Sequence, residues 1–415
     1  MSVDRPVGSR PAPADLAAML AAAPHRLMFF AGVTAVLVSM TWWALVLAGW
    51  RWGWPVPQPA PPVPAGWAHA VMLVFGMLPM FFFGFLLTVF PRWLDRPALS
   101  RRAYVPVFAC TFGGYLLAHA GLLGTHALFV IGLLFVFSGH TLAFAVLAGV
   151  LRASGRRDRH AISAISALAC GLVAQGLFLA FALGAPATLA PAAIELGVIG
   201  LLLPVYFTVC HRMIPFFSGN VAPGYRVVRP TWSLPVMWLL LAAHAACTLA
   251  HAPEWRWLAD LGLFALFAWH VVAWQPWKAR RPGLLAVLHI ALAWLPVAFA
   301  LYAWQSLALL LDLPGVPPRV PVHVLTVGYF GSMLVAMVTR VTQGHSGRPL
   351  VMGTLPWVTF IGVQGVVLLR VLADFSRDPG AWLAIAAAAW IVAFLPWVLR
   401  SAMIYLTPRI DGKPG

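Results

Sequence analysis

The sequence predicts an all-α polytopic membrane protein, and three observations favour this fold class. Of the 415 residues, 62% are hydrophobic and 9% are charged, whereas a soluble globular domain carries about 25% charged residues. Apolar stretches of about 20 residues, the length of a helix that crosses a bilayer, recur along the whole chain. The 20 tryptophans are typical of a chain with many membrane–water interfaces. This composition excludes a cytosolic enzyme, a disordered scaffold and a nucleic-acid-binding protein.

Twelve stretches are long and apolar enough to form transmembrane helices. The close spacing of the third with the fourth, and of the fifth with the sixth, favours antiparallel hairpins. Residues 1–24 are expected to form a loosely ordered cytoplasmic tail without a cleavable signal peptide, 25–408 the transmembrane domain and 409–415 a short cytoplasmic tail. The predicted spans are 27–49, 67–90, 104–123, 126–151, 161–183, 190–210, 231–250, 256–275, 283–305, 320–341, 353–372 and 381–404.

The basic residues predict the orientation of these spans. Of the 27 Lys and Arg residues, we count 22 on the side of both termini, four on the other side (Arg51, Arg256, Arg319 and Arg377) and Arg370 inside span eleven. Because cytoplasmic loops carry the excess of Lys and Arg, both termini are expected in the cytoplasm of a bacterium and the protein in its inner membrane. The net charge of +16 then reflects sidedness and contact with the lipid bilayer, and it requires no nucleic-acid partner.

Acidic residues and cysteines are scarce in the predicted spans. Glu195, near the outer end of span six, is the only carboxylate that we place inside a span. Transporters driven by proton or sodium gradients usually bury several acids, so this count argues against an ion-coupled pump. The four cysteines lie far apart and form neither a CxxC pair nor a secreted disulfide framework.

Histidine is the over-used polar residue, with 13 copies, and two of them enter the membrane at similar depth from the outer side. His69 heads a helical stripe in span two that continues through Met72, Gly76 and Met80. His323 heads a stripe in span ten that includes Thr326, Phe330, Met333, Met337 and Arg340. Imidazole is a common axial ligand of haem iron. The pattern predicts a b-type haem between the two histidines, lined by Met72 and Met333; ordinary helix packing is the alternative.

A second group of polar residues is basic and lies on the cytoplasmic side. Arginines pair well with carboxylates, so this group predicts a site for haem propionates, with lipid contact as the alternative. The predicted arginines are Arg26, Arg212, Arg340 and Arg348. His25, His211 and His345 are candidate metal ligands in the same region, and Cys210, His211 and Met213 form a weak set of soft donors for copper(I).

Three segments resemble the NnrS family. HVLTVGYFGSMLVAMVTRVTQGHSGRPL (residues 323–350) resembles the family signature, and RMIPFF (residues 212–217) and the His25-Arg26 pair resemble its other markers. The resemblance implies twelve spans and a haem- and copper-containing inner-membrane protein associated with denitrification and tolerance of nitric oxide. It makes His323, Arg340, His345, Gly347 and Arg348 the leading site residues, followed by Arg212, Pro215 and His25. Many members carry an H-x-H-E pattern at the start of span two, where this chain has only His69.

The layout also resembles, more distantly, the catalytic subunit of haem-copper oxidases, which has twelve helices and binds a haem between the second and the tenth. We therefore predict a haem-binding membrane protein of the nitric oxide response, served by an electron donor. The alternative is a membrane transporter of copper or a small solute. A nitric oxide-reducing enzyme of the haem-copper type is a third hypothesis, and the residues do not decide whether the protein is an enzyme.

Overall fold

The computed structural model describes residues 13–55 and 63–412, and within them all regular structure is helical. The helices are α1 (Pro13–Leu20), α2 (Pro24–Trp52), α3 (Ala65–Val71), η1 (Met72–Met77), α4 (Leu78–Trp93), α5 (Arg101–Leu123), α6 (His126–Ser154), α7 (Arg159–Ala182), α8 (Leu189–Glu195), η2 (Leu196–Leu202), α9 (Leu203–Val221), α10 (Ser233–Leu249), η3 (Pro253–Trp255), α11 (Trp257–Ala273), η4 (Pro276–Lys278), α12 (Gly283–Leu310), α13 (Val320–His323), η5 (Val324–Gly331), α14 (Ser332–His345), α15 (Thr354–Ala373) and α16 (Pro379–Tyr405). The all-α fold class is confirmed.

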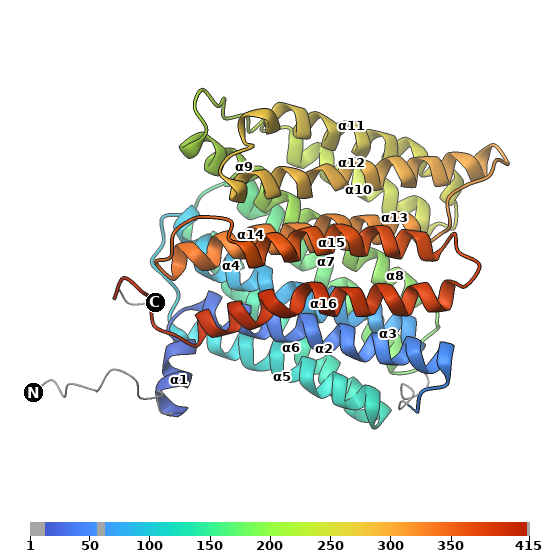
Figure 1. Ribbon diagram of the computed structural model, residues 1–415, viewed down its shortest axis with the longest axis horizontal. Coiled ribbons are helices and arrows are strands. Elements are labelled where there is room, and N and C mark those ends of the chain that lie inside the picture. The colour runs from blue at the N-terminus through green and yellow to red at the C-terminus, as the bar shows by residue number, and fades with distance from the viewer. Residues whose placement is uncertain (1–12, 56–62, 413–415) are drawn as a thin grey trace, which may run out of the picture.

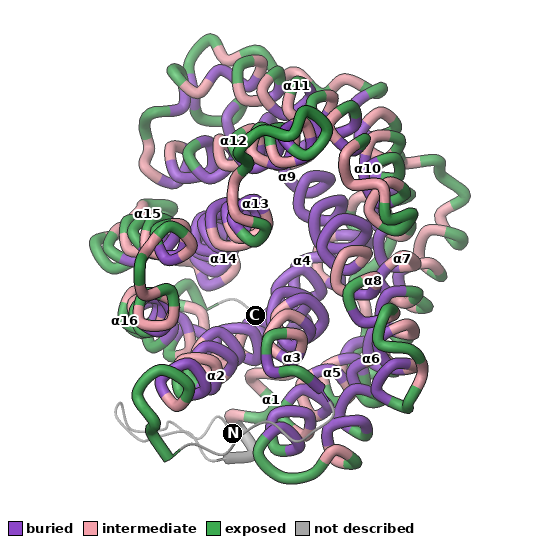
Figure 2. Tube along the Cα trace, turned by 90° about the vertical axis from the view of Figure 1, so that its right-hand side faces the viewer, coloured by how far each residue is buried: buried purple, intermediate pink, exposed green. Residues whose placement is uncertain are grey.

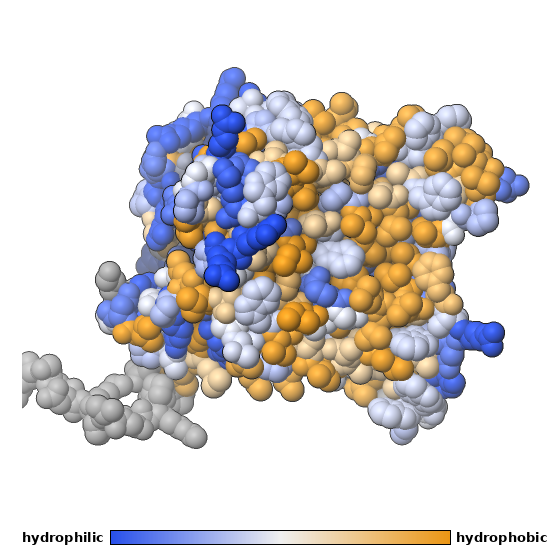
Figure 3. Space-filling view, turned by 45° about the horizontal axis from the view of Figure 1, so that its top comes forward, coloured by the Kyte–Doolittle hydropathy of each residue, from blue (hydrophilic) through white to orange (hydrophobic). Residues whose placement is uncertain are grey.

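Eleven helices of the described chain are long and apolar enough to cross a membrane. They coincide with eleven of the predicted spans. The remaining stretch, 231–250, forms the apolar helix α10, which is shorter at 17 residues, so the number twelve stays a prediction. The helices lie side by side with α1 and the last described residues at one end (Figure 1). An apolar band covers the middle of the molecule and hydrophilic residues gather towards the ends (Figure 3).

Two predicted boundaries and one predicted tail differ from the structure. Span six was expected to end at residue 210 but continues as α9 to Val221, and span ten continues to His345. The RMIPFF and TRVTQGH segments are therefore helical. Residues 13–20 of the expected loosely ordered tail form α1, where Arg26 donates to the backbone oxygen of Met19; the first twelve residues lie outside the described chain.

Three spans form the inside of the bundle. The most apolar windows of spans two, six and ten are 89%, 78% and 78% buried, whereas the windows of the other spans are 39–56% buried. Figure 2 shows α4, α9 and α14 as buried tubes surrounded by the remaining helices. Spans two and ten, which carry His69 and His323, thus belong to one inner set, while a full haem-copper-oxidase-like arrangement stays a prediction.

The same three spans each contain a π-helical segment, namely η1, η2 and η5. Pro79 and Pro204 lie just after the first two, and proline has no N–H to continue the α-helical ladder. The carbonyl oxygen of Phe75, four residues before Pro79, instead accepts a hydrogen bond from Nε2 of His140 at 2.9 Å. A π turn inserts extra residues and changes which side chains share a face of the helix, and such segments are frequent at functional sites.

Candidate cofactor site

A cavity of about 770 Å³ lies among the three inner spans. Its walls include residues of α3, α8 and α13, which lie at the end of the bundle opposite α1 and the last described residues (Figure 1). Most of the lining is apolar, with aromatic side chains and a few polar groups. A cavity of this size and composition is typical of a small-molecule or cofactor site.

His69 lies in this wall and has one ring nitrogen without a partner. Its imidazole stacks on the indole of Trp43, with ring centroids 4.5 Å apart and an angle of 16° between the planes. Nδ1 of His69 is buried and has no hydrogen-bond partner in the described chain. Trp43 therefore fixes the orientation of the ring, and a free nitrogen remains for a ligand.

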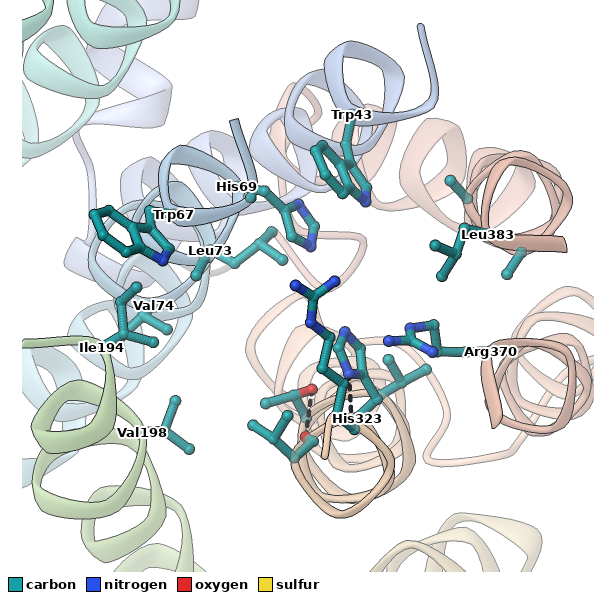
Figure 4. A pocket seen from close by; sticks show the side chains of 18 of the residues that line it. Trp43, Trp67, His69, Leu73, Val74, Ile194, Val198, His323, Arg370 and Leu383 are labelled. Carbon is teal, nitrogen blue, oxygen red and sulfur yellow. Dashed lines mark hydrogen bonds between the residues drawn. The ribbon is translucent and has the colours of Figure 1, made fainter. Parts of the chain in front are cut away.

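His323 lines the same cavity, as predicted, and its second nitrogen is available. The Nδ1–H of His323 donates to the carbonyl oxygen of Arg319 at 2.8 Å. A carbonyl oxygen only accepts, so the proton resides on Nδ1 and Nε2 keeps its lone pair. The side chains of His69, His323 and Arg370 extend from three helices into one space (Figure 4).

Four arginines also line the cavity: Arg51, Arg256, Arg319 and Arg370. Three of them pair with a carboxylate, Arg51 with Asp378 at 2.7 Å, Arg256 with Asp260 at 3.1 Å and Arg370 with Asp374 at 2.7 Å. The guanidinium of Arg51 holds the pKa of Asp378 below its usual value through this bond. Within the described ranges, Arg319 has no ion-pair partner. The cavity therefore presents one uncompensated cation next to two imidazoles.

The predicted stripes below the two histidines line the cavity only in part. Thr326 of span ten lines it as predicted, together with Val327 and Gly331, whereas span two contributes Leu73 and Met77 in place of Met72 and Gly76. Met72 is buried elsewhere in the core, and Met333 lines a separate apolar cavity of about 50 Å³. The physical reason is η1 and η5, whose π turns shift the face that a 3.6-residue period predicts.

The four predicted propionate arginines do not line the His69–His323 cavity, and each has its own surroundings near the other end. Arg26 donates to the backbone oxygen of Thr407 at 2.8 Å. Arg340 lies over the ring of Phe217, 3.9 Å from its centroid. Nη1 of Arg348 is buried without a partner in the described chain. The histidine pair and this basic group are therefore two regions and not one site.

Arg212, the remaining predicted arginine, ties two helices together. Its guanidinium donates to Oδ2 of Asp158 at 2.8 Å, while Oδ1 of Asp158 accepts from the N–H of Ala161 and caps α7. Burial raises the pKa of Asp158, but the bonds from Ala161 and Arg212 outweigh it and the pKa falls below its usual value. This contact between α9 and the start of α7 explains the presence of Arg212 without a bound propionate.

His25 and His345, two predicted metal ligands, do come together. Their ring centroids lie 4.2 Å apart, with 33° between the planes, although they begin α2 and end α14. His211 lies elsewhere, with its Nδ1 3.0 Å from Nε2 of His160.

The soft-donor set around Cys210 does not converge. The thiol of Cys210 accepts from the hydroxyl of Tyr329 at 3.4 Å and lines the small cavity, whereas His211 contacts His160. Within the described chain, no group of three or more His, Cys, Asp or Glu side chains is arranged to hold a metal ion.

A charged network that the sequence did not predict lies in the cavity wall. Asp260, which was not recognised as an acid within a span, is fully buried and lies 2.5 Å from Nδ1 of His244. Glu195 lies 2.9 Å from Nε2 of the same ring and lines the cavity. The available signal was the position of Asp260 four residues after Arg256 at the start of an apolar stretch.

Comparison with known proteins gives the family. The model of the NnrS family, described as NnrS protein, matches residues 19–409. The chain belongs to the NnrS family. None of the curated proteins compared with the chain is a match. The family assignment made from the three sequence segments is thereby confirmed, and family membership supports a role in the response to nitric oxide.

Proposed function

We propose that this NnrS-family protein is a haem-binding protein of the bacterial inner membrane that acts in the response to nitric oxide. The observation that carries the haem proposal is one mostly apolar cavity of about 770 Å³ with His69 and His323 in its wall. Each imidazole has a nitrogen free to bind iron. A haem held by two imidazoles supplies a redox-active iron suited to electron transfer.

The chain supplies binding and orientation for this group. Trp43 holds the ring of His69, and the carbonyl oxygen of Arg319 fixes the tautomer of His323. Arg319 is the first candidate for a propionate because it has no ion-pair partner in the described chain, and Arg370 adds positive charge to the same wall. The mostly apolar lining suits the apolar faces of the group.

Absorption spectroscopy tests the proposal. Protein purified from haem-replete cells is expected to show a Soret band and the spectrum of low-spin b-type haem. His69→Ala and His323→Ala are each expected to abolish or alter this spectrum. His119→Ala is the matched control, because His119 is a buried histidine that does not line the cavity, and its spectrum should match that of the unmodified protein.

A colourless preparation would contradict the haem proposal. If such a protein moved copper or another small solute into proteoliposomes, the alternative of a membrane transporter would replace it. Addition of nitric oxide to the reduced protein separates two roles. A spectral change would mean that the gas takes the place of His69 or His323, and an unchanged spectrum would favour electron transfer from a donor.

Copper is a second part of the proposal, and it rests on the His25–His345 pair. Two imidazoles from opposite ends of the chain lie with ring centroids 4.2 Å apart, and imidazole suits copper. Metal analysis of purified protein tests this part. His25→Ala and His345→Ala are expected to lose copper and keep the haem spectrum, whereas equal copper in both variants and the unmodified protein would contradict it.

A further inference from the structure

A buried ionic network adjoins the proposed haem cavity. His244 of α10 lies between two carboxylates, with Nδ1 2.5 Å from Oδ1 of Asp260 in α11 and Nε2 2.9 Å from Oε1 of Glu195 in α8. Arg256 donates from Nε to the other oxygen of Asp260 at 3.1 Å. The side chains of His244 and Asp260 are fully buried. Four ionisable groups from three helices thus form one chain of contacts.

The geometry fixes the number of protons in this network. An ionised carboxylate only accepts hydrogen bonds, and a neutral imidazole carries only one N–H. Both nitrogens of His244 face carboxylate oxygens, so the ring is doubly protonated or one carboxyl group holds a proton. Glu195, His244 and Asp260 therefore share one proton beyond those of a neutral imidazole and two carboxylates. With that proton, the network including Arg256 has no net charge.

The remaining groups that face the network are neutral. Arg256 donates to Oε1 of Gln305 at 2.9 Å, and its guanidinium lies 5.0 Å from the ring centroid of Tyr302 on α12. Arg256 also contacts Thr248 of α10, and the rings of Tyr302 and His244 lie nearly perpendicular with their centroids 5.3 Å apart. The charge of the network therefore depends on its own acids, His244 and Arg256.

Glu195 is the acid of the network that lines the cavity. Glu195 and Arg256 line the cavity, whereas His244 and Asp260 lie behind them. The side chain of Glu195 is 22% exposed. Burial of charges inside a membrane protein is costly, so groups of this kind are candidates for function and not only for stability. A proton leaving or entering the triad passes Glu195.

We infer that Glu195, His244 and Asp260 form a proton-loading site coupled to the charge of the group bound in the cavity. The inference rests on the proposed haem function. If a one-electron oxidant took an electron from the group held in the cavity, the added positive charge would make the triad release its shared proton: the N–H or O–H bond at the triad would break, and the exposed part of Glu195 would pass the proton to water. If a one-electron reductant returned the electron, one proton would return from water to the triad.

Redox titration of the purified holoprotein at several pH values tests this inference. If one proton is released for each electron lost, the equilibrium constant for reduction changes tenfold per pH unit. This corresponds to a change of about 59 mV in the reduction potential of a one-electron couple. The haem potential is expected to fall with rising pH at a slope approaching this value. Glu195→Gln, which keeps the size of the side chain and removes the acid, is expected to lose most of the slope.

Glu254→Gln is the matched control, because Glu254 is the second of the two glutamates in the sequence and does not line the cavity. It should keep the slope of the unmodified protein. An infrared difference spectrum between reduced and oxidised protein gives a second readout, in which a carboxyl signal is expected that Glu195→Gln removes. A merely structural role of Glu195 would change thermal stability and leave the slope intact.

The outcomes separate the inference from the proposed function. A haem whose potential is independent of pH, or a Glu195→Gln variant with an unchanged slope, overturns the proton-loading site and leaves haem binding in place. A preparation without haem overturns both. A variant of the fully buried His244, such as His244→Gln, is not needed for the test and could fail to fold. The comparison between Glu195→Gln and Glu254→Gln decides whether the proton-loading site exists, because Glu195 lies at the cavity side of the network.

Discussion

Hydrogen-bond partners and position together distinguish the two proposed haem ligands from the other buried histidines. His140 donates from Nε2 to Phe75 and accepts at Nδ1 from Gln175, and Nδ1 of His270 donates to Leu266, so their ring nitrogens serve the fold. His69 and His323 each keep a free nitrogen at a cavity. An unpaired nitrogen alone does not separate the two classes, because His119, His126, His211 and His289 also have one. Its position in the wall of the cavity does.

The cavity arginines lead to a prediction that compares two proposed anion sites. Arg319→Gln is expected to lower the affinity for haem about tenfold or more, since a hydrogen bond to a charged group contributes about 1.5–3 kcal/mol. Arg340→Gln is the control, because Arg340 lies over Phe217 and outside the cavity. Titration of each apo-protein with haem measures the effect. Loss of affinity only in Arg340→Gln would instead favour the basic group at the other end.

The sequence contained a signal that these arginines share a site, but we used their positions only to predict the topology. Arg51, Arg256, Arg319 and Arg370 are four of the five basic residues that the positive-inside count leaves off the cytoplasmic side. All four line the cavity. A cation in a span or on the side with few cations needs a local reason, and here all four share one cavity, three of them paired with a carboxylate. Asp260 was missed because its partners, His244 and Glu195, come from other helices and no local pattern joins them.

The inner helices show where hydrophobic periodicity fails. The structure confirms the positions of eleven predicted spans. These positions could be predicted because length and hydropathy are local properties of the sequence. The predicted faces of spans two and ten agree with the cavity lining only as far as Thr326, because η1 and η5 break the 3.6-residue period. A proline marks the first two π segments, but η5 contains none, so its position depends on contacts that the sequence does not reveal.

The bond from His140 to Phe75 leads to a prediction for the first π segment. His140→Ala is expected to destabilise the protein by about 1–3 kcal/mol, because it leaves a buried carbonyl oxygen unpaired. In a Pro79→Ala background the new N–H can reach that oxygen, so the same change should cost less. A double-mutant cycle in thermal or denaturant unfolding measures the difference. Equal costs in both backgrounds would show that the carbonyl of Phe75 does not depend on Pro79.

The hairpin of α5 and α6 leads to a prediction that uses two neighbouring glycines. A Cβ atom on Gly114 would meet the backbone nitrogen of Val136 at 2.6 Å, whereas a Cβ atom on Gly113 would meet nothing within 4 Å. Gly114→Ala is expected to destabilise the hairpin by about 1–3 kcal/mol through overpacking. Gly113→Ala should be neutral or slightly stabilising, because alanine favours a helix. Unfolding of both variants checks this, and equal stability would contradict the close packing.

At the scale of the whole molecule, the packing of the bundle determines which spans lie inside, and no single span encodes this. The mean hydropathy of spans four and nine is 2.2 and 2.3, close to the 2.4 of span two. The most apolar windows of spans four and nine are nevertheless only 44% and 56% buried, whereas that of span two is 89% buried. Which helices lie inside is a property of long-range packing, so the sequence predicted the spans without predicting the inner set. The cavity, its arginines and the buried network all follow from this arrangement of three inner spans.

The position of the chain ends leads to a prediction about the number of crossings. The first and last described helices begin and end at the same end of the bundle (Figure 1), which requires an even number of crossings. Eleven helices qualify by length, so α10, with 17 residues, is expected to cross as well. At about 1.5 Å per residue it is about 25 Å long, somewhat less than a hydrocarbon core of about 30 Å.

Reporter fusions measure both the crossing and its direction. Green fluorescent protein is expected to fluoresce when fused at the C-terminus or after Arg229, since the positive-inside count places both in the cytoplasm. Alkaline phosphatase is expected to be active after Ala252, beyond α10, and after Arg377, beyond α15. Fluorescence on both sides of α10 would contradict its crossing. The opposite pattern at every site would place the proposed haem cavity at the cytoplasmic surface, where the proposed proton exchange would be with the cytoplasm.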